Sequence, residues 1–319
     1  MGVRKDQSKL TTAERKAFVD AVLKLKNDGV VLDGVRIWYD DFVLTHNRFI
    51  GSDTDQGRRI GHRSPSFLPW HREYLRSFER ALQTIDPTVN LPYWNWTVDR
   101  TAGAPIWNED FMGGNGDRRT DGRVTNGPFA HSKGKWNITR TTDSNPRLRR
   151  SLGVGGTLPT VADLDRVKAL KTYDVTPWNS ASSFTTGFRN ALEGWRPRPQ
   201  PSAMHNAVHV WVGGNMAGGA SPNDPVFWLH HCFIDKIWSD WQQTNPNVSY
   251  TTKAELDRDF DNRDPRTNRD NRDNIVHLDK AMAPPERRNE VGEVIPDNFT
   301  VPTMKPSELL SHTAWYTYE

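Results

Sequence analysis

The sequence predicts a mainly α-helical fold, with an antiparallel four-helix bundle of histidine-bearing helices at its centre and long irregular loops around it. His205 and His209 stand four residues apart in an apolar stretch. Because a helix turns once in about 3.6 residues, both imidazoles leave the same helix face. Farther along, Phe227, His231 and Trp238 share one face of a second helical stretch. The glycine-rich turn between the two stretches lets the second helix fold back on the first, which brings three histidines together.

The N-terminal part is expected to add two further helices to this core. Thr11 and Glu14 form a capping-box pattern, which predicts a helix over 11–28. Residues 35–50 then place His46 on an apolar helix face. A histidine in such a stripe is usually a satisfied core residue, so its interpretation depends on the histidines that follow.

A loop and a third helix supply two more histidines. Residues 51–67 are rich in glycine, serine and aspartate, and this predicted loop contains His62. A helix is expected over 68–85, with His71 on its inward face. A ligand on a loop must be held by its neighbours, so His62 is expected to be less rigid than a histidine on a helix.

The other segments are predicted to form the scaffold of a single domain that spans 1–319. An aromatic extended segment is expected at 91–97, and 98–180 lacks periodicity and is expected to be irregular. A short helix is expected at 185–195. Residues 252–300 are strongly charged and are interpreted as a loop insertion within the domain.

Flanking residues predict the ends of the two helices in the second histidine region. Ser202 is expected to cap the first helix, and Gly213–Gly214 to end it. Asp224 is expected to cap the second helix, with Pro225 at its first position.

Composition excludes several classes of partner. Lys and Arg number 42 against 39 Asp and Glu, and they are interspersed, so the footprint of a nucleic-acid-binding protein is missing. No apolar run reaches about 18 residues, so no membrane span is expected. The single cysteine, Cys232, excludes an internal disulfide.

Two groups of histidines indicate a metal centre. Neutral imidazole is the commonest metal-ligating side chain, and sites with only nitrogen ligands suit copper, zinc, iron or nickel. Two groups without a carboxylate or a thiolate favour copper. The first triad is His46, His62 and His71, and the second triad is His205, His209 and His231.

Two stretches, GHRSPSFLPWHREYL and SPNDPVFWLHHCFIDKIW, resemble the copper signatures of tyrosinases, most closely those of Streptomyces-type bacteria. The similarity extends along almost the whole chain. It implies a type-3 centre of two copper ions that uses O2 as co-substrate, with one triad holding each ion. His230 points about 100° away from His231 on its helix and is interpreted as structural.

The resemblance implies a copper-dependent oxidoreductase that hydroxylates monophenols to o-diphenols and oxidises o-diphenols to o-quinones. Hydroxylation requires the phenol to lose its proton, and in the family a glutamate and an asparagine hold the water thought to act as base. Glu193 and Asn206 match these two residues. However, the proline-rich connector at 196–201 makes the stretch between Glu193 and His205 longer than in close relatives. An oxidase of catechols or o-aminophenols with little or no hydroxylation therefore stays an alternative.

Further features follow from comparison with the family pattern. No cysteine lies near His62, so the thioether found in fungal and plant relatives is not expected, and Cys232 is interpreted as a buried, inert thiol. The resemblance also implies a small helper protein that delivers copper and covers the site. Because the N-terminal residues lack the apolar core of a secretory signal, the chain is expected to be cytoplasmic or exported with that helper.

Two other classes of protein are disfavoured. A reversible O2 carrier of the hemocyanin type is disfavoured because the chain is short and has no shielding domain. A dizinc hydrolase is disfavoured because bridging carboxylates are missing from both triads.

Overall fold

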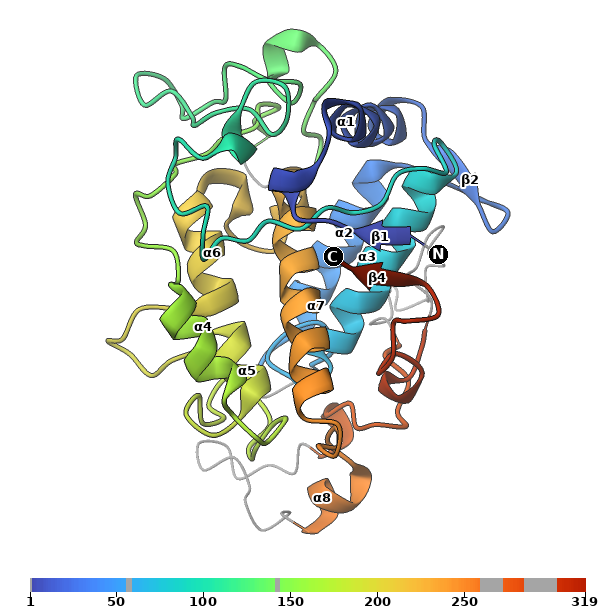
Figure 1. Ribbon diagram of the computed structural model, residues 1–319, viewed down its shortest axis with the longest axis vertical. Coiled ribbons are helices and arrows are strands. Elements are labelled where there is room, and N and C mark those ends of the chain that lie inside the picture. Colours follow the sequence, from blue (N-terminus) through green and yellow to red (C-terminus); the bar gives the residue numbers. More distant parts are fainter. Residues whose placement is uncertain (1, 56–58, 141–143, 259–271, 284–302) are drawn as a thin grey trace, which may run out of the picture.

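A computed structural model describes residues 2–55, 59–140, 144–258, 272–283 and 303–319. Their architecture is mainly helical, as predicted (Figure 1). The helices that carry the predicted histidines are α2 (Tyr39–Ser52), α3 (Phe67–Gln83), α6 (Met204–Val212) and α7 (Val226–Thr244).

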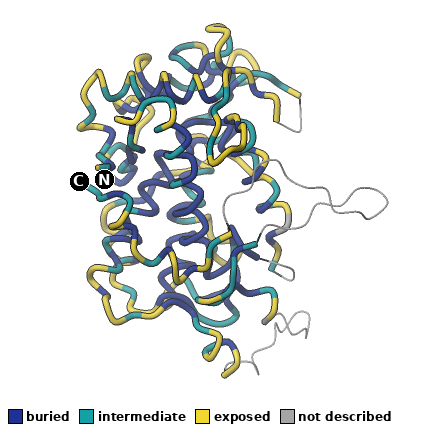
Figure 2. The backbone as a smooth tube through the Cα atoms, turned by 90° about the vertical axis from the view of Figure 1, so that its right-hand side faces the viewer, coloured by how far each residue is buried: buried dark blue, intermediate teal, exposed yellow. Residues whose placement is uncertain are grey.

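Helices α3 and α7 form the centre of the molecule. The rings of Phe78 and Trp228 stack across them with centroids 3.6 Å apart. Helix α2 packs against α3, where the Tyr74 hydroxyl donates a 2.7 Å hydrogen bond to the Phe42 carbonyl. Figure 2 shows buried residues concentrated along these central helices. Helix α6 packs on α7. Together, α2, α3, α6 and α7 are the helices predicted to form the antiparallel four-helix bundle.

Four further helices lie around this centre. Thr11 caps α1 (Thr12–Asn27) through the predicted capping box with Glu14. Helix α5 (Phe188–Glu193) falls inside the predicted 185–195, and the remaining two are α4 (Val161–Lys168) and α8 (Lys253–Arg258). Short 3₁₀ turns occur at Gln7–Lys9, Pro105–Trp107, His131–Lys133, Gly214–Met216, Ser221–Asn223, Arg272–Asn274 and Pro306–Glu308.

Helix α4 corrects the expectation that 98–180 is irregular throughout. Thr160 and Asp163 form a reciprocal capping box at its start. Only Leu164 and Val167 are buried on this eight-residue helix. A stripe of two apolar residues is too short to stand out as a helical period, although the capping pattern was visible in the sequence.

The start of α6 and the start of α7 each differ from the prediction by one residue, whereas the end of α6 follows it. Helix α6 begins one residue after Ala203, and no side chain caps it, so Ser202 lies too early to be its N-cap. The helix ends at Gly213, where φ is +62°. Helix α7 has Pro225 at its N-cap and Val226 at its first position, one residue later than predicted. Asp224 precedes the N-cap, and one of its oxygens accepts the Val226 backbone N–H at 3.2 Å.

Two small sheets complete the regular structure. Strand β1 (Gly2–Arg4) pairs in parallel with β4 (Tyr316–Tyr318), so the two ends of the chain lie side by side (Figure 1). Strands β2 (Val30–Leu32) and β3 (Val35–Ile37) form an antiparallel hairpin.

A buried charge network, made of Arg4, Arg72, Glu79 and Asp235, ties the paired termini to α3 and α7. The Arg72 Nε donates to Asp235 at 2.6 Å, and Arg4 donates to Glu79 at 2.8 Å. The Tyr316 hydroxyl also donates to Asp235 at 2.6 Å. Buried charges are stable only when they are paired and hydrogen-bonded, so the network fixes how the two helices face each other.

A second buried pair anchors the irregular segment that covers the core. Arg150 donates two hydrogen bonds of 2.7 Å to Asp224, which directly precedes the N-cap of α7. Its other nitrogen donates to the carbonyls of Met112, Gly113 and Gly114. Arg150 and the backbone of Met112–Gly114 are therefore fastened to the start of the helix that carries His231.

Most of the charged insertion predicted at 252–300 lies outside the described residues. Its described parts are 272–283 and 252–258, and the latter contain helix α8 where a loop was expected. Within the described chain, no helix is long and apolar enough to cross a membrane.

Candidate metal centre

The second triad forms a tight cluster of ring nitrogens. The Nε2 atom of His205 lies 3.0 Å from that of His209 and 3.3 Å from that of His231, and the third distance is also 3.3 Å. The His209 Nδ1 lies 2.8 Å from the Met216 carbonyl, and the His205 Nδ1 lies 3.0 Å from the Asn206 Oδ1. An oxygen of this kind only accepts, so Nδ1 carries the proton in both rings and Nε2 carries a lone pair.

This arrangement fits a metal ion. Lone pairs of neighbouring imidazoles repel each other at about 3 Å unless a cation lies among them. Imidazole nitrogens bind ions such as Zn²⁺ at about 2.0–2.1 Å, so the triangle of Nε2 atoms in the second triad leaves room for one ion of this size. The hydrogen bonds to Nδ1 fix the rings of His205 and His209 in the orientation that such an ion needs.

His230 lies beside the second triad without entering its triangle of Nε2 atoms. It is fully buried, and its ring is nearly parallel to that of His205, with centroids 5.1 Å apart. Its ring nitrogens come within 4.8 Å of those of the triad, so distance alone would count it as a fourth candidate ligand. We keep the interpretation that His230 is structural, because the three Nε2 atoms of the triad already face one another.

The first triad brings together three separate segments. The ligand atoms of His46, His62 and His71 all lie within 4.8 Å of one another, and all three side chains are buried. The His46 Nδ1 donates to the Gly219 carbonyl at 2.7 Å, and the His71 Nδ1 donates to the Phe67 carbonyl at 2.8 Å. Their Nε2 atoms are buried and have no hydrogen-bond partner, which is the condition expected of ligands to an ion.

Asp53 holds His62, the one candidate ligand that lies on a loop. Its carboxylate accepts the backbone N–H groups of Ile60 and His62, both at 2.7 Å. One of its oxygens also lies 3.4 Å from the His62 Nδ1. Burial is the main cause that raises the Asp53 pKa to about 7. The sequence prediction missed this residue, and the only signal was an aspartate directly after a helix.

The two triads adjoin each other through α3 and α7. The rings of His71 and His231 stack with centroids 4.3 Å apart and an angle of 12° between their planes. Burial lowers the pKa of His46 to about 3 and that of His209 to about 4, and it also lowers the pKa of the other four candidate ligands well below the usual value. Six neutral imidazoles, the form that binds metal, therefore surround one region.

The two residues expected to hold a water, Glu193 and Asn206, meet at His205. The Glu193 carbonyl lies 3.4 Å from the His205 Nδ1, on the same side as the Asn206 Oδ1. The Glu193 carboxylate is fully buried, and it accepts the Arg63 N–H at 2.7 Å and the Arg189 guanidinium at 2.9 Å. The Asn206 Nδ2 is buried without a hydrogen-bond partner.

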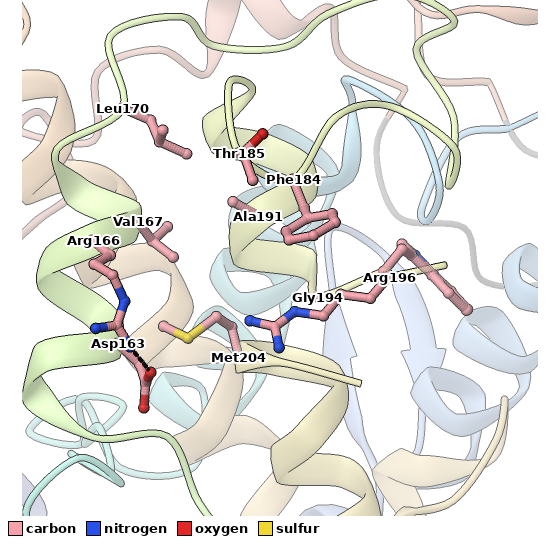
Figure 3. Close-up of a pocket in the computed structure, with 11 residues that line it drawn as sticks. Asp163, Arg166, Val167, Leu170, Phe184, Thr185, Ala191, Gly194, Arg196 and Met204 are labelled. Carbon is pink, nitrogen blue, oxygen red and sulfur yellow. Dashed lines mark hydrogen bonds and ion pairs between the residues drawn. The ribbon is translucent and has the colours of Figure 1, made fainter. Parts of the chain in front are cut away.

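A cavity of about 380 Å³ opens onto both triads. This volume is in the range of pockets that bind small molecules. Four of the six histidines line it, together with Asp53, Arg63, Trp195, Asn206, Val210 and five further residues. Trp195 also lines a second cavity of about 270 Å³, which contains none of the histidines (Figure 3).

The single cysteine, Cys232, lies on α7 directly after His231. Cys232 is fully buried, and burial raises its pKa to about 12. Both facts agree with the prediction of a buried and inert thiol.

Comparisons with known proteins agree with the geometry. Residues 36–244 match the family profile described as the common central domain of tyrosinase. The chain is 48% identical to a tyrosinase of Streptomyces glaucescens and 47% identical to one of Streptomyces antibioticus, over all of this chain and 99% and 100% of theirs. Its fold is similar to that of a polyphenol oxidase from Thermothelomyces thermophila, with a TM-score of 0.67, 23% identity, and coverage of 100% of this chain and 89% of that one.

Proposed function

Since this chain belongs to the tyrosinase family, we propose that each of its two histidine triads holds one copper ion of a dinuclear centre. The chain is a copper-dependent oxidoreductase that hydroxylates monophenols to o-diphenols with O2 and oxidises o-diphenols to o-quinones. The observation that carries this proposal is the convergence of the Nε2 atoms of the second triad beside a buried first triad. When bound, the copper pair supplies O2 binding and two-electron redox chemistry.

The protein contributes ring orientation, a dry site and access for a phenol. Hydrogen bonds at Nδ1 point the Nε2 atoms of His46, His71 and His209 inward. Aromatic rings surround these histidines, for example Phe227, whose ring centroid lies 4.1 Å from that of His231. Such packing keeps water out and holds the imidazoles still.

Glu193 and Asn206 are proposed to hold the water that takes the proton of a monophenol. The unpartnered Asn206 Nδ2 supports this role, because it offers a donor to a water at the lining of the cavity. The Glu193 carboxylate is fixed by two donors, and each carboxylate oxygen can accept more than one hydrogen bond. The two side chains could therefore share one water next to His205.

One observation favours the alternative, an oxidase of catechols or o-aminophenols with little hydroxylation. The Glu193 side chain does not belong to the lining of the cavity, and both of its oxygens already have partners. A carboxylate held in this way is a poor partner for a mobile water. Oxygen uptake measured with tyrosine, catechol and o-aminophenol in parallel separates the two activities.

The metal assignment is tested by metal analysis of His209→Ala. We expect two coppers in the wild-type protein, about one in the variant, and loss of oxygen uptake with catechol. His277→Ala serves as the matched control, because His277 belongs to neither triad and should keep both coppers. Two coppers in His209→Ala, or zinc in preference to copper in the wild type, would contradict the proposal.

We also propose that a small helper protein delivers copper and covers the cavity, and that the chain is exported together with it. The exposed Val210 at the cavity, with 44% of its surface accessible, offers an apolar contact for such a partner. Affinity purification from separate cell and culture fractions tests both points. Recovery of the chain alone and only from the cytoplasm would contradict them.

A further inference from the structure

The lining of the site cavity contains one strong cation near its opening. Among the described residues of this lining, Arg63 is the only arginine or lysine. Its guanidinium carbon lies 4.3 Å from the centroid of the Trp195 ring, so the two side chains stack. About one third of the Arg63 side chain is exposed to solvent.

The position of Arg63 is fixed from two directions. Its backbone N–H donates to the Glu193 carboxylate at 2.7 Å, in a left-handed conformation with φ of +53°. Its guanidinium lies 3.5 Å from the Asp55 carboxylate, which itself accepts the N–H and hydroxyl of Ser180 at 3.1 and 2.6 Å. The guanidinium carries five N–H groups, and the Asp55 contact uses one of its nitrogens at long range, so donors remain for a ligand.

Arg63 and Trp195 line the same cavity as His46, His62, His205 and His209. Arg63 directly follows His62, and Trp195 follows Glu193 by two residues. A phenol ring whose hydroxyl faces the histidines would point its opposite substituent toward the stacked pair. Asp53 is the acidic member of the cavity lining, and its carboxylate accepts the His62 backbone N–H.

We propose that Arg63 and Trp195 form a rim that recognises a carboxylate on the substrate. The preferred substrates are then phenols and o-diphenols whose side chain, opposite the reacting hydroxyl, ends in a carboxylate. Guanidinium binds carboxylate through two parallel hydrogen bonds, and stacking on an aromatic face holds its plane in place. The inference rests on the proposed function only in that the phenol ring enters this cavity.

A neighbouring arginine provides a matched control. Arg196 follows Trp195 directly, and its guanidinium lies 5.3 Å from the Phe184 ring. It lines the second cavity, where it extends past Phe184 toward Met204 (Figure 3). Replacing Arg196 therefore removes the same charge from the same surface region without changing the lining of the site cavity.

The test compares kcat/KM for three o-diphenols on copper-loaded protein: 3,4-dihydroxyphenylacetate, 4-methylcatechol and dopamine. These substrates need no hydroxylation, so the result does not depend on Glu193 or Asn206 as a base. In Arg63→Gln we expect the preference for the carboxylate over 4-methylcatechol to fall about three- to tenfold, since partly exposed charge pairs are weaker than buried ones. Arg63→Lys should keep part of the preference, and Arg196→Gln should keep nearly all of it.

A binding measurement gives a readout that does not depend on turnover. Phenylacetate, which has no reactive hydroxyl, should bind the wild type more tightly than Arg63→Gln in isothermal titration calorimetry, and the difference should shrink as salt is added. An equal preference for the carboxylate substrate in wild type and Arg63→Gln, or an equal loss of that preference in Arg196→Gln, would overturn the proposed role of Arg63 and Trp195. If the wild type oxidises none of the three o-diphenols, the proposed function fails instead.

Discussion

The two triads reach similar arrangements by different routes. In the second triad, two histidines lie one turn apart on α6, and the third lies on the fully buried face of α7. In the first triad, the three histidines come from α2, a loop and α3. The Nε2 atoms of the second triad lie within 3.3 Å of one another, and the ligand atoms of the first triad also lie close together.

The different origins of the ligands, from helices or from a loop, show where each site obtains its rigidity. Helix geometry already places His205 and His209 on one face, so the second triad needs only the packing of α6 on α7. His62 does not lie on a helix that would fix its orientation. Asp53 orients it instead, by accepting the backbone N–H of His62. We therefore expect the second triad to be preformed and the first triad to depend on a single carboxylate.

The largest expected effect concerns Asn206, which lies beside His205 of the second triad and is proposed to help remove the proton of a monophenol. In Asn206→Ala, tyrosine hydroxylation should fall about 10²–10⁴-fold while catechol oxidation changes little, because only the monophenol needs a general base. Asn206 also accepts a hydrogen bond from His205, so the two rates must be compared on protein with equal copper content. Glu193→Gln should act in the same direction. An equal fall of both activities would show that the pair is structural.

The second largest effect should be a loss of metal from both triads alike. Asp235→Ala removes the partner of two buried arginines, Arg72 and Arg4, and should lower the free energy of unfolding by about 3–5 kcal/mol. Because the network braces both α3 and α7, both triads should lose metal together. Chemical denaturation and copper analysis measure the two effects.

Asp240→Ala is the control for this change. Asp240 lies on the same helix but forms a partly exposed pair with Lys236, so the expected loss is below about 1 kcal/mol. If Asp235→Ala is as stable as this control, the buried network does not hold the helices together.

Asp53→Ala should widen the difference between the triads. Removing a residue that orients a ligand typically weakens metal binding about 10–100-fold. We expect this loss for one copper only, with the second copper held as in the wild type, in a competition titration against a copper(I) chelator. Asp55→Asn lies on the same loop but pairs with Arg63 and Ser180, and it should leave both affinities unchanged. Weaker copper binding at both sites in Asp53→Ala would contradict the claim that only the first triad depends on Asp53.

The smallest effect concerns the order of metal loading. Ordering one side chain costs about 0.5–1.5 kcal/mol, which corresponds to roughly three- to tenfold in affinity. His46→Ala, which keeps the second triad, should therefore bind its one copper three- to tenfold more tightly than His209→Ala, which keeps the first. The same competition titration decides this, and equal affinities would mean that the His62 loop is as well ordered as the helices.

The sequence by itself determined the elements whose information is local. The helical period placed His205 and His209 together, the capping box located α1, and the two copper signatures identified the family. Helix type and face depend on residues within one or two turns, so a reader of the sequence has all the needed information. The same locality explains the missed α4, whose apolar stripe is too short to form a recognisable period.

Only the tertiary structure decided how distant segments meet. The carboxylate of Asp53 at His62, the two donors that hold Glu193, the stacking of Arg63 on Trp195 and the pairing of β1 with β4 all join residues without a shared local period. Their positions follow from packing and from the need to pair every buried charge and polar group, and these conditions apply to the whole folded chain. For this reason the sequence located the six candidate ligands, while the residues that hold and surround them became visible only in the fold.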